Sequence, residues 1–92
     1  MEKFFHDYIE LQKNALDSIP LNEVGSMLEI LQKAHKDKKN IFVFGNGGSA
    51  ANASHFATDL GKGASDKVGI FKVFSLNDNT PWITALGNDY SY

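Results

Sequence analysis

The stretch Ile41–Leu60, IFVFGNGGSAANASHFATDL, decides the fold class of this chain. It opens with a short, continuous apolar run, 41–44, which is typical of a strand buried on both faces in a parallel sheet. A Gly-rich turn, Gly45–Ser49, comes next. The Ala-rich stretch 49–60 predicts a helix, and Gly61 is placed to end it. A strand, a tight turn and a helix in this order predict the start of a βαβ unit.

Two helical patterns precede this stretch. Apolar residues fall at helical spacing over 1–17 and again over 21–38, and Pro20 separates the two runs. We therefore expect two amphipathic helices. The run Lys36–Lys39 suits the carboxyl end of the second helix, where cations are favoured, and is interpreted as a solvated surface. Residues 1–40 are thus predicted to form an N-terminal helical hairpin.

A second strand and a short helix follow the central stretch. After a polar connection over 62–69, the apolar residues of 70–76 predict a strand. Thr80 is a suitable N-cap for a helix over 82–86, which Gly87 is placed to end. The complete order of elements predicts an α/β fold. Two strands are few for such a sheet, which usually has about four to six.

Composition excludes several classes of protein. The chain has 92 residues, 42% of them hydrophobic and 22% charged, which is a globular mixture. A net charge of −2 argues against a general binder of nucleic acids or acidic membranes. The absence of Cys excludes disulfides and thiolate metal sites. No apolar run approaches the roughly 20 residues of a membrane span, and no signal-peptide core is present, so a cytoplasmic location is expected.

The Gly-rich turn is a candidate anion site. Glycines between a strand and a helix allow close backbone approach, and the first N–H groups of the helix then face the anion. Asn46 and the Ser49 hydroxyl add donors, so a phosphorylated metabolite is a suitable ligand. A P-loop is excluded because Ala50 and Ala51 stand where it needs Gly and Lys. The turn also matches a dinucleotide fingerprint, but the acid expected at the end of the next strand is missing, with Asp78 only beyond it.

His55 and Asp59 form the second candidate feature. They are four residues apart on the predicted helix and therefore project from one face. Such a pair can bind a divalent metal ion or act as acid and base, and it can equally be an ordinary surface pair. Two ligands are fewer than a zinc site usually has.

Two blocks, Phe44–Leu60 and Thr84–Tyr90, resemble sugar isomerase (SIS) domains, and among them the phosphoheptose isomerases. The resemblance implies a three-layer α/β sandwich around a parallel sheet, of which residues 41–92 would be the first part. It implies interconversion of sedoheptulose 7-phosphate and a manno-heptose 7-phosphate through an enediol, for heptose in surface polysaccharide. It also implies a zinc ion held partly by His55 and Asp59, with Asp59 as the catalytic carboxylate. The implied substrate contacts are Asn46, Gly47, Gly48, Ser49, Asn88 and Asp89.

Departures from the family pattern leave alternatives open. Many members of the family have Glu where this chain has Asp59, which is one methylene shorter. The family is also longer, so we expect residues 1–92 alone to be inactive, to associate through uncovered apolar surface, and to represent part of a homotetrameric enzyme. A phosphosugar-binding SIS module without catalysis is the main alternative. A binder of nicotinamide nucleotides is the next.

Overall fold

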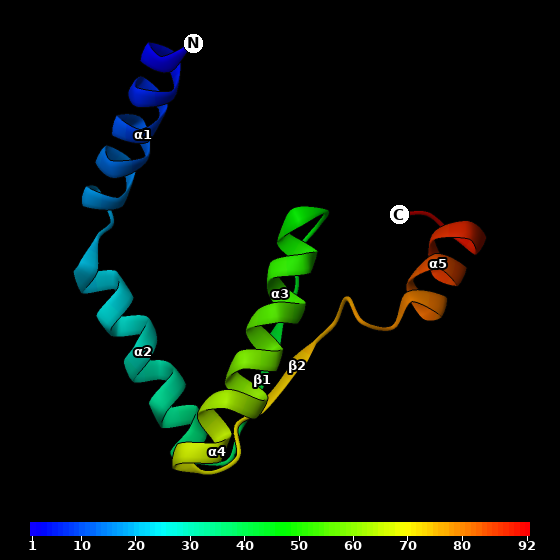
Figure 1. Ribbon diagram of the computed structural model, residues 1–92. Helices are drawn as coiled ribbons and strands as arrows, with labels where there is room; N and C mark the ends of the chain where they lie inside the picture. The colour runs from blue at the N-terminus through cyan, green and yellow to red at the C-terminus, as the bar shows by residue number, and fades with distance from the viewer. The chain divides into compact units, whose positions relative to one another are not determined.

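A computed structural model describes residues 1–92, which form helices and one small parallel sheet (Figure 1). The chain divides into two units, Met1–Ile30 and Leu31–Tyr92. The α/β class is confirmed. No helix is both long and apolar enough to cross a membrane. The elements in chain order are α1 (Glu2–Asp17), α2 (Leu21–Lys36), β1 (Asn40–Val43), α3 (Gly48–Thr58), the π-helix η1 (Asp59–Ala64), α4 (Ser65–Val68), β2 (Lys72–Ser75) and α5 (Thr80–Asp89).

The two predicted N-terminal helices are present as α1 and α2. The chain leaves α1 at Ser18, whose hydroxyl donates to the Ala15 carbonyl at 2.7 Å. Pro20 directly precedes α2, and its carbonyl accepts the N–H groups of Glu23 and Val24. This use of proline fits its fixed φ and its missing donor. The packing of residues 1–40 as a hairpin stays a prediction.

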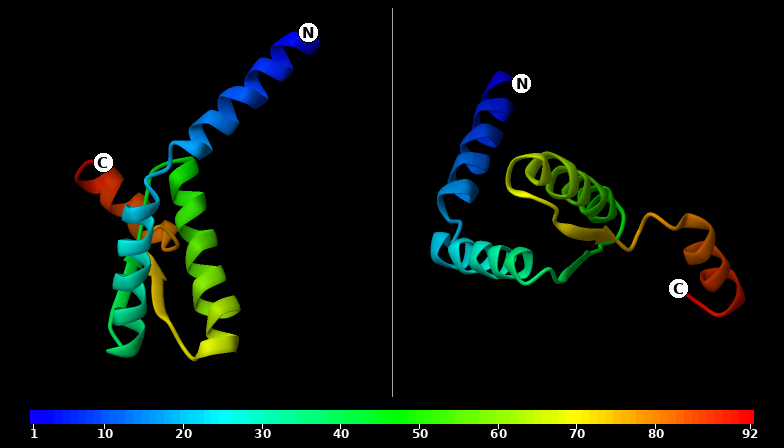
Figure 2. Two further views of the ribbon diagram at one scale, coloured as in Figure 1. Left: turned by 90° about the vertical axis from the view of Figure 1, so that its left-hand side faces the viewer. Right: turned by 90° about the horizontal axis from the view of Figure 1, so that it is seen from below.

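The sheet consists of β1 and β2, which run parallel with Ile41 opposite Val73 and Phe42 opposite Phe74. One face is covered, because α3 contacts both strands and runs alongside them (Figure 2). The other face carries the stacked rings of Phe42 and Phe74, whose centroids are 5.7 Å apart. Those rings are 55% and 49% exposed, so within the chain the strands are covered on one face and not on both as expected.

The prediction that Gly61 ends the central helix was wrong. Helical structure continues from α3 through η1 and α4 as far as Val68, which replaces the expected polar connection over 62–69. Gly61 lies close to β2, where an added Cβ would be 3.1 Å from Val73 Cγ1. The residue that ends the helical segment is Gly69, whose φ of 95° is readily adopted only by glycine.

The last helix is longer than predicted. Its N-cap is Asn79, whose side-chain oxygen accepts the Trp82 N–H at 3.2 Å, so Thr80 is the first helical residue and not the cap. The helix also passes through Gly87, which was expected to end it. An added Cβ at Gly87 would overlap the Tyr92 ring, so the glycine allows the chain end to fold back closely.

Ala53 is the only buried hydrophobic residue, at 7% exposure. It lies in the middle of α3, the helix that packs on the sheet. Large apolar side chains remain exposed in the unit Leu31–Tyr92, where Phe44 is 72% and Ile70 is 80% exposed. The chain therefore holds its sheet together with little interior of its own.

Candidate functional site

The Gly-rich loop connects β1 to α3 and contains two glycines that no other residue replaces easily. Gly47 is the N-cap of α3 with a φ of 54°, in the region that favours glycine. Gly45 lies against the first turn of the helix, where an added Cβ would be 2.6 Å from Ser49 Cβ and 2.7 Å from its carbonyl carbon. Gly48 lacks both constraints, because its φ is not positive and no atom lies within 4 Å of an added Cβ.

Hydrogen-bond accounting shows which loop donors are free. The Ser49 N–H donates to the Asn46 carbonyl at 2.9 Å, and the N–H groups of the next two residues donate to Gly47. The Gly45 N–H donates to the side-chain oxygen of Asn77. The N–H groups of Asn46, Gly47 and Gly48 donate to no acceptor in the chain. Three consecutive free donors at a helix N-terminus are the arrangement that an anion needs.

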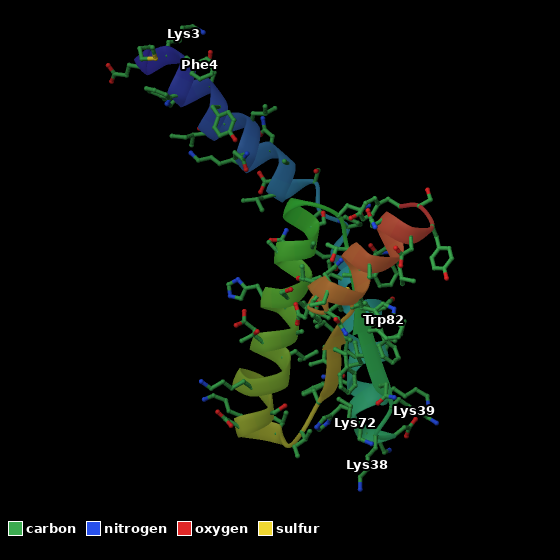
Figure 3. All side chains as sticks on the ribbon, turned by 90° about the vertical axis from the view of Figure 1, so that its right-hand side faces the viewer. Lys3, Phe4, Lys38, Lys39, Lys72 and Trp82 are labelled. Carbon is green, nitrogen blue, oxygen red and sulfur yellow. The ribbon has the colours of Figure 1, made fainter.

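Positive side chains do not surround this loop. Lys38, Lys39 and Lys72 gather where the strands begin, whereas the loop leaves the sheet where β1 ends (Figure 3). An anion at the loop would therefore be held chiefly by backbone N–H groups and the helix dipole. The anion site itself stays a prediction.

His55 and Asp59 are brought together as predicted. His55 lies in the last turn of α3, Asp59 is the first residue of η1, and Nε2 of the imidazole is 3.3 Å from Oδ2 of the carboxylate. Both side chains are open to ligands, at 76% and 73% exposure.

The donor set of this pair suits part of a zinc site. Two donors that bind one zinc ion tetrahedrally at about 2.0–2.1 Å lie about 3.3 Å apart, which matches the separation of His55 Nε2 and Asp59 Oδ2. No group of three or more His, Cys, Asp or Glu residues in the chain could hold a metal ion. The pair therefore fits as two ligands of a larger set.

Asn88 and Asp89 lie at the carboxyl end of α5. The Asn88 side-chain amide donates to Asp89 Oδ1 at 3.3 Å, and no hydrogen bond joins either residue to the Gly-rich loop. Asp89 lines a surface hollow together with Asn79, Trp82 and Tyr90. Their role as substrate contacts stays a prediction.

Sequence reasoning missed a hydrogen-bond network beside the loop. The Gly45 N–H donates to Asn77 Oδ1 at 2.9 Å, and the Ser54 hydroxyl donates to Asp78 Oδ1 at 2.5 Å. Ser54 Oγ is also 3.3 Å from Ser75 Oγ at the end of β2. The run of short polar residues directly after a strand, 77–79, was the available signal.

Together these features define an α/β protein with a Gly-rich loop, open to an anion, between its first strand and the next helix. No family model matches the chain. A probable phosphoheptose isomerase of Thermoplasma volcanium is 37% identical over 86 residues, which are 94% of this chain and 44% of the relative. The phosphoheptose isomerase of Aquifex aeolicus is 34% identical over 99 residues, covering all of this chain and 48% of the relative.

A solved structure of a protein with the same name is also similar to this chain. The structure of phosphoheptose isomerase GmhA from Neisseria gonorrhoeae matches 98% of this chain and 45% of its own, with a TM-score of 0.68 and 28% identity. The chain thus spans about half the length of the relatives it matches. These similarities support the phosphoheptose isomerases as the family of this chain.

Proposed function

We propose that the protein is a phosphoheptose isomerase, which interconverts sedoheptulose 7-phosphate and D-glycero-D-manno-heptose 7-phosphate for the synthesis of heptose in surface polysaccharide. The observation that carries this proposal is a loop with three free N–H groups at the start of α3 and the exposed pair His55 and Asp59 at the end of the same helix. Similarity to proteins of that name over nearly the whole chain supports it. The further proposals are a cytoplasmic location and a homotetramer with one zinc ion per subunit.

The reaction moves a proton between two adjacent carbon atoms of the sugar, and it therefore needs a base and a group that stabilises the enediolate oxygen. In this proposal Asp59 is the catalytic carboxylate. The loop residues Asn46, Gly47, Gly48 and Ser49 bind the substrate, and so do Asn88 and Asp89. Free backbone donors suit a ligand with a dianionic phosphate and many hydroxyl groups.

His55 and Asp59 are the residues of this chain that would hold zinc. When bound, zinc would polarise an oxygen atom of the substrate. The role of Asp59 differs between two arrangements: as a metal ligand it positions the ion, and as a free carboxylate it takes the proton. Its exposure of 73% leaves it accessible for either role.

The test measures whether the protein, as its source produces it, catalyses exchange of a substrate hydrogen atom with solvent deuterium. Incubation with sedoheptulose 7-phosphate in D₂O should give an aldose 7-phosphate that carries one deuterium on C2, seen by mass spectrometry and NMR. Asp59→Asn should slow the exchange by about 100-fold or more, while Asn14→Ala, at an exposed site on α1, serves as the matched control. An Asp59→Asn variant that exchanges at the parental rate would contradict the assigned role.

The same experiment addresses the alternative of a phosphosugar-binding module without catalysis. The feature that favours this alternative is the shorter Asp59, whose carboxylate is paired with His55 at 3.3 Å. A module would bind the sugar phosphate, with shifts in the amide signals of the loop, and would incorporate no deuterium. That result would replace the isomerase proposal.

A further inference from the structure

Three consecutive side chains between β2 and α5 each bind a different part of the unit Leu31–Tyr92. Asn77 Oδ1 accepts the Gly45 N–H at 2.9 Å, and Asp78 Oδ1 accepts the Ser54 hydroxyl at 2.5 Å. Asn79 Oδ1 accepts an N–H group in the first turn of α5 at 3.2 Å. This short connection therefore joins the Gly-rich loop, α3 and α5.

The bond from Gly45 to Asn77 spans 32 positions of sequence and is partly buried. Gly45 also lies close to the first turn of α3, because a Cβ added to it would be 2.7 Å from the carbonyl carbon and oxygen of Ser49. The next three residues, 46–48, carry the free N–H groups. Asn77 thus binds Gly45, the residue that directly precedes the three free N–H groups.

We propose that Asn77 is a positioning residue of the phosphosugar site: it fixes Gly45 so that the N–H groups of Asn46, Gly47 and Gly48 converge on one anion. This inference rests on the proposed function. Without the Asn77 oxygen, the partly buried Gly45 N–H loses its acceptor, and such a group moves toward water or another partner. The loop then shifts, and the donors lose their common target.

The kinetic signature of this role differs from that of a structural one. The non-reacting phosphate end of a substrate is bound in the ground state and in the transition state alike, so its weaker binding raises KM and leaves kcat unchanged. One lost hydrogen bond to a charged ligand lowers the affinity by about ten- to hundredfold. A merely structural residue would lower the melting temperature and leave KM as it is.

The test compares Asn77→Leu with Ser65→Ala, both in the protein as its source produces it. Ser65 is a matched control because its hydroxyl oxygen also accepts a partly buried backbone N–H, that of Phe71 at 2.9 Å, near the opposite edge of the sheet. With sedoheptulose 7-phosphate as substrate, Asn77→Leu should raise KM at least about tenfold and change kcat less than about threefold. Ser65→Ala should lower the melting temperature to a similar extent and leave KM unchanged.

Equal KM values for Asn77→Leu and the parent protein would overturn the inference, and so would a parallel change in Ser65→Ala. A parent protein that neither isomerises nor binds the sugar phosphate would instead overturn the proposed function, and the positioning role with it. Hydrogen exchange in the parent protein keeps the test valid if Asn77→Leu fails to fold. The Gly45 amide should be protected without ligand, and the Gly48 amide only after sedoheptulose 7-phosphate is added. Equal exchange rates of the Gly45 and Gly48 amides without ligand would show that Asn77 does not hold Gly45 and would refute the proposal.

Discussion

Replacement of glycines within one loop tests the geometry of the site, because Gly45 and Gly48 have opposite surroundings. A Cβ at Gly45 would be 2.6–2.7 Å from three atoms of Ser49, two of which belong to the backbone. Ordinary carbon contacts are about 3.5–4.0 Å, so the overlap is about 1 Å and no rotamer can relieve it. We expect Gly45→Ala to lower the free energy of unfolding by about 2–3 kcal/mol, the upper part of the overpacking range.

Gly48→Ala should have the opposite effect on stability. The site is open and Gly48 is the first residue of α3, so alanine should raise the free energy of unfolding by up to about 1 kcal/mol through its better helix propensity. The added methyl group would stand on a residue that carries one of the three free N–H groups proposed to bind the ligand. We therefore expect a more stable protein that binds sedoheptulose 7-phosphate at least about tenfold less tightly, which corresponds to about 1.4 kcal/mol.

Urea denaturation and ligand titration measure the two quantities separately. Gly63→Ala is the control, since Gly63 is also helical and also has no atom within 4 Å of an added Cβ. It should gain stability like Gly48→Ala and keep normal binding. Gly45→Ala with parental stability, or Gly48→Ala with parental affinity, would refute this description of the loop.

Three further predictions concern other parts of the chain. Asp59→Asn should reduce the rate of isomerisation by about 100-fold or more, and Asp59→Glu should retain most of the activity. Both should change the free energy of unfolding by less than about 1 kcal/mol, because the Asp59 carboxylate is exposed. The Lys33 ammonium, 2.7 Å from Asp37, lowers the pKa of that carboxyl by hydrogen bonding and charge, so an NMR titration should show the Asp37 midpoint rise in Lys33→Met. Because the folded-state pKa is lowered, the pair stabilises the fold above the ordinary carboxyl pKa, and this contribution disappears as the pH falls through the lowered value. An isolated polypeptide of residues 1–92 should associate in light scattering, since its large apolar side chains are exposed; a monodisperse monomer would contradict this.

Local patterns in the sequence predicted most elements of the fold. Hydrophobic periodicity located α1 and α2, and the change from an apolar run to a Gly-rich turn located β1 and the start of α3. These signals depend on neighbouring residues only. The end of the central helix could not be read in the same way, because Gly61 and Gly69 are both possible stops. Gly61 lies beside β2, where an added Cβ would be 3.1 Å from Val73 Cγ1, and this closeness depends on residues distant in the sequence.

In the candidate site, too, features that depend on neighbouring residues could be predicted, and features that depend on distant residues could not. Spacing along one helix was enough to bring His55 and Asp59 together, since residues four apart share a face. The role of Asn77 depends on a contact 32 positions away, and no local pattern specifies which polar residue of a turn reaches which N–H group. The choice of Asn79 over Thr80 as the cap of α5 is a similar case, because both residue types cap helices well.

The hydrogen bonds around the Gly-rich loop also determine when the site forms during folding. They connect residues 24 and 32 positions apart, so the entropy of closing long loops must be overcome before they exist. Helical turns of α3 need only local contacts and form on a faster timescale. The candidate anion site, like the pairing of β1 with β2 over the same 32 positions, should therefore form after the helices and open before them under mild denaturant, so that ligand binding disappears while most of the helical signal remains.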